Sequence, residues 1–166
     1  TAPTPRHEVC SDDAAEALPQ VTDGGRTYTF KVKKGVHFTD DPVFGGKKRE
    51  LVAEDVVYSL KRLADPKLRS PWVFLVEGKF VGLDEEIAAA KQGGKFDYDK
   101  KLPGLEVVDK YTLRLRLKDT DYNLPYVLAH EPTAIVAREV IEKYGESDGR
   151  AMANPVGSGP YRLAQW

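Results

Sequence analysis

The chain has 166 residues, of which 41% are hydrophobic and 31% are charged, as in a globular domain. A chain of this length can bury about 68–70% of its unfolded surface, so it needs neither a disulfide nor a metal ion to hold a core. Lys and Arg total 25 and Asp and Glu total 26, which excludes the one-sided charge that would collect nucleic acid or an anionic membrane.

The chain begins with a polar, proline-rich stretch, residues 1–22, for which we expect a loosely ordered N-terminal arm with at most one helical turn at 14–18. After a turn signal at 23–25, residues 27–33 alternate between apolar and polar side chains. Because successive side chains of a strand point to opposite faces, this alternation predicts a half-buried strand. A loop with glycines, a proline and three consecutive basic residues follows at 40–49.

Residues 53–64 have the spacing of an amphipathic helix, with Val56, Leu60 and Leu63 on its apolar face. Acidic residues lie near the start of this segment and basic residues near its end, as the helix dipole favours. The helix should end before Pro66, because the residue that precedes a proline avoids the helical conformation.

The start of this helix lacks a polar side chain at the capping position, which is occupied by Val52. Valine has no acceptor for the N–H groups of the first turn, so a cap worth about 1 kcal/mol is missing. We therefore expect Glu50 or a loop carbonyl to take its place.

The second half of the chain shows a similar mixture of helical and strand patterns. Two segments around a short turn alternate in polarity as a β-hairpin does, and the remaining periodic segments have helical spacing. We expect an α+β fold in which a small, twisted and mostly antiparallel sheet has helices packed on it. The further helices are expected at 83–92, 124–130 and 137–144, and the further strands at 105–108, 111–118 and 161–166.

Candidate catalytic and metal-binding groups are sparse. His7 and Cys10 could supply two metal ligands, but no second pair follows them. The adjacent acidic pairs point apart on a strand or helix, so they do not form the facing carboxylates of a glycosidase. The glycines Gly157 and Gly159 precede an alternating segment and not a helix, which predicts a tight turn and not a phosphate-binding loop. We expect no catalysis, no metal and no cofactor.

One aromatic residue is a candidate for contact with a ligand. Trp72 follows Ser70 and Pro71 just beyond the helix at 53–64, where a rigid proline can hold an indole at the surface. An indole offers a broad apolar face with a single hydrogen-bond donor, which is common in binding clefts. Trp72 is therefore a candidate for ligand contact, with packing in a loop as the alternative.

Five motifs stand out along the chain: Tyr28-Thr-Phe, Val36-His-Phe-Thr-Asp40, Ala53-Glu-Asp-Val-Val-Tyr-Ser-Leu-Lys-Arg62, Asp109-x-Tyr-Thr-Leu-Arg-Leu and Gly157-Ser-Gly-Pro-Tyr161. In this order and spacing they resemble the family 5 extracellular solute-binding proteins, the peptide, dipeptide and nickel receptors of ABC importers. The resemblance implies a subdomain of a type II periplasmic-binding-protein fold that performs no chemistry. It also places Pro71-Trp72 at a Pro-aromatic position that contacts peptide in oligopeptide receptors, which makes Trp72 our predicted ligand-binding residue.

The resemblance further implies that the chain is part of a larger receptor. Residues 23–155 would form the small extra subdomain beside the ligand cleft, and 156–166 would begin a truncated large lobe. The implied partners are a peptide or similar small solute and an ABC permease in the membrane, with no nucleic acid. The implied location is periplasmic or extracytoplasmic, with the signal segment outside this chain. We also expect self-association through residues 161–166, where a sheet edge would be bare.

Two other interpretations remain open from the sequence. The chain could be a free-standing interaction domain that docks a protein through Trp72 and the loop around Lys47. It could also be a hydrolase that uses Cys10 or a buried carboxylate, which would require a histidine within reach of the nucleophile.

Overall fold

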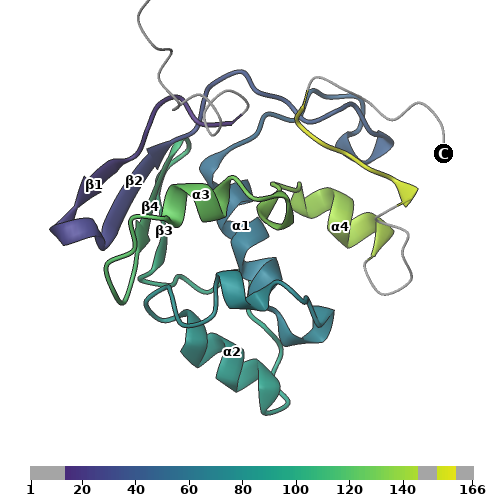
Figure 1. Cartoon of the computed structure of the whole chain (residues 1–166). Helices are drawn as coiled ribbons and strands as arrows, with labels where there is room; N and C mark the ends of the chain where they lie inside the picture. Colours follow the sequence, from purple (N-terminus) through teal and green to yellow (C-terminus); the bar gives the residue numbers. More distant parts are fainter. Residues whose placement is uncertain (1–13, 146–152, 160–166) are drawn as a thin grey trace, which may run out of the picture.

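The computed structural model describes residues 14–145 and 153–159, and these form an α+β fold with a four-stranded sheet, as predicted (Figure 1). No helix in these two ranges is both long and apolar enough to span a membrane. Short 3-10 helices η2 to η6 connect the longer elements. The strands and helices are β1 (Gln20–Thr22), β2 (Thr27–Lys31), α1 (Ala53–Ala64), α2 (Leu83–Lys91), β3 (Leu105–Asp109), β4 (Thr112–Arg116), α3 (Leu124–Leu128) and α4 (Arg138–Tyr144).

The sheet has the order β1-β2-β4-β3, and every neighbouring pair is antiparallel. Tyr28 of β2 lies opposite Leu115 of β4, and Leu115 lies opposite Leu105 of β3, so three apolar side chains meet across the sheet. All three are buried. The alternation predicted for 27–33 is confirmed, because Tyr28 and Val32 are buried while Lys31 is exposed.

Helix α1 contacts β3 and β4 and supplies much of the core on that side of the sheet (Figure 1). It spans the predicted residues 53–64. Its most buried apolar positions include Val57 and Leu60, whereas Val56 and Leu63 are only partly buried. The buried face is therefore turned toward Val57 relative to the predicted one, because the helix is covered by the sheet on one side and by the segment after α3 on another.

Of the two predicted substitutes for the missing cap of α1, the structure shows the loop carbonyl. The N–H of Ala53 donates to the carbonyl oxygen of Lys110 at 3.0 Å. In addition, Asp55 in the first turn reaches back, and its Oδ2 accepts the N–H of Val52 at 2.9 Å. Glu50 does not cap the helix; its carboxylate instead accepts bonds from Gly35, Lys110 and Tyr111.

The sheet begins earlier than the sequence predicted. Residues 20–22, which lie inside the predicted arm 1–22, form β1 along the edge of β2. Residues 14–18 do not form the expected helical turn: Ala15 pairs with Val32 in a β-bridge, and the N–H of Lys33 donates to the carbonyl oxygen of Ala14 at 2.9 Å. Pairing with the free edge of β2 satisfies backbone groups that a single helical turn would leave open.

Some sequence predictions fall outside the described residues. His7, Cys10 and the strand expected at 161–166 are among them. The expected self-association through 161–166 therefore stays a prediction, which sedimentation velocity over a range of concentrations tests.

Candidate ligand-binding surface and neighbouring cleft

The segment that carries Trp72 is a tight turn fixed by hydrogen bonds to its own backbone. Trp72 precedes η5 (Val73–Leu75), and its N–H donates to Oγ of Ser70 at 3.2 Å while its carbonyl oxygen accepts the N–H of Leu75 at 3.0 Å. Leu75 and Val76 are buried and anchor the turn in the core. The backbone of Trp72 is thus held in place, and its indole lies at the surface, 40% exposed.

Two other rings contact this indole. The ring centroid of Phe74 is 5.9 Å from that of Trp72, and the ring centroid of His130 is 5.4 Å away, with interplanar angles of 42° and 46°. Tyr126, on α3, precedes His130 by four residues, and the N–H of His130 donates to the carbonyl oxygen of Val127 at 3.2 Å, so both side chains belong to the same short stretch of chain. We call Trp72, Phe74, Tyr126 and His130 the aromatic surface; all four residues are exposed.

The backbone beneath His130 is also fixed. Its carbonyl oxygen lies 2.6 Å from Oγ1 of Thr133 and accepts the backbone N–H of Thr133 at 2.9 Å. Thr133 is buried in η6 (Glu131–Thr133), next to α1. The two halves of the aromatic surface therefore come from distant parts of the sequence, and each half rests on a buried anchor.

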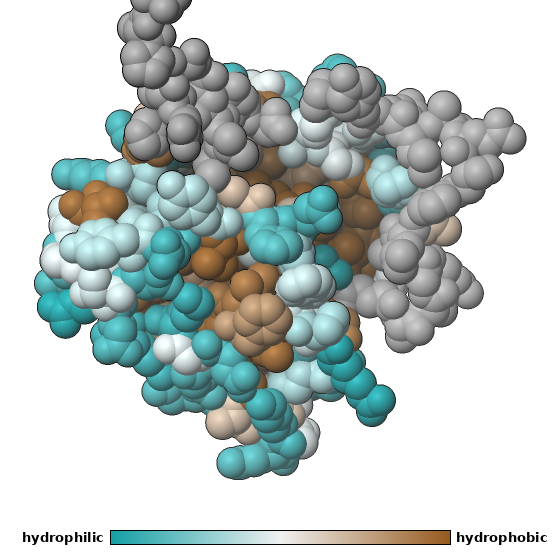
Figure 2. All heavy atoms as spheres, viewed as in Figure 1, coloured by the Kyte–Doolittle hydropathy of each residue, from teal (hydrophilic) through white to brown (hydrophobic). Residues whose placement is uncertain are grey.

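Sequence reasoning singled out Trp72 but missed the other members of the aromatic surface. The spacing of Tyr126 and His130 on a short helix was a signal for a shared face, and it was visible in the sequence. No local pattern indicated that His130 meets Trp72, because that contact depends on how the segment after α3 packs against α1. Figure 2 shows apolar residues exposed across the middle of the face where α1, α3 and α4 lie, with hydrophilic residues around them.

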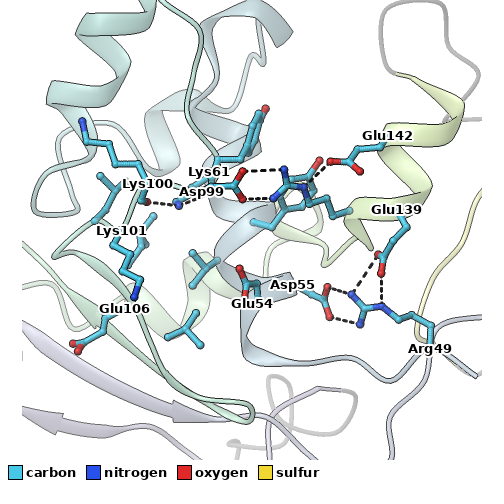
Figure 3. Close-up of a pocket in the computed structure, with 17 residues that line it drawn as sticks. Arg49, Glu54, Asp55, Lys61, Asp99, Lys100, Lys101, Glu106, Glu139 and Glu142 are labelled. Carbon is cyan, nitrogen blue, oxygen red and sulfur yellow. Dashed lines mark hydrogen bonds and ion pairs between the residues drawn. The ribbon is translucent and has the colours of Figure 1, made fainter. Parts of the chain in front are cut away.

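A cleft of about 580 Å³ lies beside α1, between α4, β3 and the segment 98–102 (Figure 3). Arg49 occupies one end: its guanidinium donates to both carboxylate oxygens of Asp55 at 2.7 and 3.0 Å, and its Nε donates to Oε1 of Glu139 at 2.8 Å. Burial raises the pKa of Asp55, and the bonds from Arg49 oppose that rise. These bonds connect the loop before α1 to helix α1 through Asp55 and to helix α4 through Glu139.

The middle of the cleft is crossed by Arg138 of α4. This side chain pairs with Asp99 and donates from Nε to Oε1 of Glu142 at 2.6 Å, and its guanidinium lies 5.7 Å from the ring centroid of Tyr58. Lys61 of α1 is buried, and its Nζ donates to the carbonyl oxygens of Tyr98 and Lys100 at 2.7 and 2.8 Å.

Most of the charged side chains in the cleft are therefore committed to one another or to main-chain carbonyls. Desolvation lowers the pKa of the Lys61 ammonium. The hydrogen bonds of this ammonium hold the segment 98–100 against α1, so the role of Lys61 is structural. In residues 14–145 and 153–159, no group of three or more His, Cys, Asp or Glu side chains is placed to hold a metal ion. The cleft is an ionic link between elements, and the aromatic surface is the better candidate for ligand contact.

Comparison with known proteins identifies the family. The family described as "Bacterial extracellular solute-binding proteins, family 5 Middle" matches residues 11–166. The chain belongs to this family.

The chain is similar to proteins named for glutathione binding. The glutathione-binding protein GsiB of Escherichia coli O1:K1 / APEC is 29% identical to the chain over 146 residues, and that of Salmonella choleraesuis (strain SC-B67) is 30% identical over the same length. In both comparisons the match covers 88% of this chain and 22% of the relative. The chain thus spans about a fifth of the length of these relatives.

Solved structures of larger proteins share the fold. Listeria monocytogenes OppA bound to peptide has a TM-score of 0.71 at 22% identity, with 92% of this chain and 27% of that chain covered. Haemophilus influenzae OppA in complex with RPPGFSPFR has a TM-score of 0.69 at 24% identity and the same coverage. The predicted subdomain of a periplasmic-binding-protein fold is confirmed by these structures.

Proposed function

We propose that this chain is one side wall of a receptor that binds a peptide or similar small solute and delivers it to an ABC permease, without catalysis. The observation that carries the proposal is the family 5 match over residues 11–166. The named relatives bind glutathione, which is a tripeptide, and two structural neighbours hold peptides, so a short peptide is the best-supported solute class. An extracytoplasmic location follows from the same family.

Trp72 is the residue that we propose contacts the solute. Its indole is exposed although its backbone is fixed by Ser70 and Leu75, so the turn presents the ring at the surface with little backbone ordering left to occur on binding. A binding surface needs an aromatic ring that is exposed on a rigid turn, whereas a stable core buries its aromatic rings.

The chain would supply a wall and not a complete pocket. Because β1 and the bridge at Ala15 belong to the sheet, the subdomain beside the cleft would span residues 14–155, and 156–166 would lead into the large lobe. The carbonyl oxygen of Gly157 accepts the N–H of Thr39 at 2.7 Å and lies 3.1 Å from its Oγ1, which ties Gly157 to the loop before α1. One wall cannot remove a solute from water, so the 166-residue chain alone should bind peptides weakly.

Calorimetry tests this function directly. The complete gene product and the 166-residue chain are each titrated with glutathione and with trialanine. We expect the complete product to bind at least one of them with a Kd in the micromolar range or below, and the isolated chain to bind at least about a hundredfold more weakly. Equal affinity in both proteins would contradict the wall proposal, and failure of the complete product to bind any short peptide would contradict the solute class.

The same titrations separate the alternatives. Mass spectrometry of the peptide after incubation should show it unchanged, because a receptor breaks no bond; cleavage products that disappear in Cys10→Ala would support the hydrolase instead. A reading frame that stops soon after Trp166 and a chain that captures a protein through Trp72 would support the interaction domain.

A further inference from the structure

The aromatic surface has a composition that restricts what can bind to it. Trp72, Phe74 and Tyr126 carry no charge, and His130 contributes a ring in contact with the indole of Trp72. Among the described residues, no carboxylate or ammonium is ion-paired with or stacked over any of these four rings. A charged group placed against Trp72, Phe74 or Tyr126 would lose water and gain no ionic partner from these three side chains.

The rings are also arranged to accept another ring. The centroids of Phe74 and His130 lie 5.9 and 5.4 Å from that of Trp72, within the range in which aromatic pairs attract one another. The tilts of 42° and 46° leave ring faces open on the surface instead of closing them against each other. Because the backbones of Trp72 and His130 are both held by hydrogen bonds, this arrangement exists before a ligand arrives.

We propose that the aromatic surface determines specificity: it receives an aromatic or large apolar side chain of the bound peptide. This inference rests on the proposed function, and it adds Phe74, Tyr126 and His130 to Trp72 as residues that select the solute. Removal of this apolar area from water supplies the preference, and ring–ring contact with Trp72 strengthens it for an aromatic side chain. Charged side chains of either sign are disfavoured at the same position.

The test is a calorimetric scan on the complete gene product. The probes are tripeptides of alanine in which one position at a time is replaced by Phe, Leu, Lys or Glu. At one position we expect Phe and Leu to bind roughly tenfold or more tightly than Ala, Lys and Glu, which is the scale of one well-packed ring contact. Trp72→Ala and Tyr126→Ala should each bring the Phe-to-Ala affinity ratio at that position close to one, and Trp72→Phe should retain part of it.

A matched control is available on the same protein. Tyr122 is 67% exposed and Tyr126 is 68% exposed, but Tyr122 contacts the turn at Gly24 and Gly25 and not the aromatic surface, so Tyr122→Ala should leave the ratio unchanged. The inference is overturned if peptides bind but Trp72→Ala and Tyr126→Ala keep the wild-type ratio, or if Lys or Glu is preferred where these variants act. Failure of every tripeptide to bind overturns the proposed function and this inference with it.

Discussion

Replacement of Arg49 by alanine should destabilise the fold far more than replacement of the lysine beside it. Arg49 is 24% exposed and bonds through two nitrogens to Asp55, whose side chain is only 3% exposed. Without the guanidinium, the carboxylate keeps the N–H of Val52 as its bonded partner in a site that burial makes unfavourable for charge. Breaking a buried pair in this way typically costs 3–5 kcal/mol.

The partial exposure of Arg49 places the expected loss at the lower end of that range, about 3 kcal/mol, or a Tm lower by roughly 6–12 °C for a chain of this size. The control is Lys48→Ala: its Nζ lies 3.7 Å from Asp40, both side chains are about two-thirds exposed or more, and the loss should stay below about 1 kcal/mol. Urea unfolding of the 166-residue chain, followed by circular dichroism, measures both.

A double-mutant cycle completes this experiment. Arg49→Ala and Asp55→Ala should be strongly non-additive, with a coupling energy above about 1.5 kcal/mol, because the double variant leaves no buried charge unpaired. If Arg49→Ala costs no more than Lys48→Ala, or if the two changes add, the ionic link between the loop, α1 and α4 does not stabilise the fold as argued.

Two further predictions concern a carboxylate and a glycine. The ammonium of Lys110 and the N–H of Gly35 hold the pKa of Glu50 at about 2. The ionised Glu50 therefore stabilises the fold above the ordinary pKa of a glutamate, and this stabilisation is lost as the pH falls toward 2. Glu50→Gln should flatten the dependence of stability on pH below about pH 4.5 in acid titrations followed by circular dichroism, and an unchanged dependence would refute this. Gly104→Ala should cost about 3 kcal/mol or more, because a Cβ there would lie 2.5 Å from the backbone N and O of Val81. Gly78→Ala, where a Cβ meets no atom within 4 Å but φ is +77°, should cost only about 1 kcal/mol; equal losses in urea unfolding would contradict the packing argument.

The sequence predicted the elements whose signals are local. The helix at 53–64 has the bounds expected from its apolar spacing and from Pro66, and the hairpin at 105–116 follows its alternation and central turn. Strand β1 was not predicted, because its three residues are exposed and its only signal is the open edge of β2, which no local pattern reveals. The turn of the α1 face toward Val57 escaped prediction for the same reason, since it depends on what covers the helix.

The candidate site was predictable to a similar degree. Trp72 was singled out because a proline before an exposed indole is a local arrangement. Phe74 lies only two residues further on, but its contact with the indole depends on the 3-10 turn between them. His130 reaches Trp72 only through the packing of the segment after α3, which Thr133 fixes with hydrogen bonds that no periodicity predicts.

The most direct test of the central claim is a structure of the complete gene product with its bound peptide. The account predicts that the indole of Trp72 lies within about 4.5 Å of the solute, with the aromatic surface forming one side of the closed cleft. A solute bound in the cleft between Arg49 and Arg138, or a Trp72 buried against protein with no solute near it, would contradict the account.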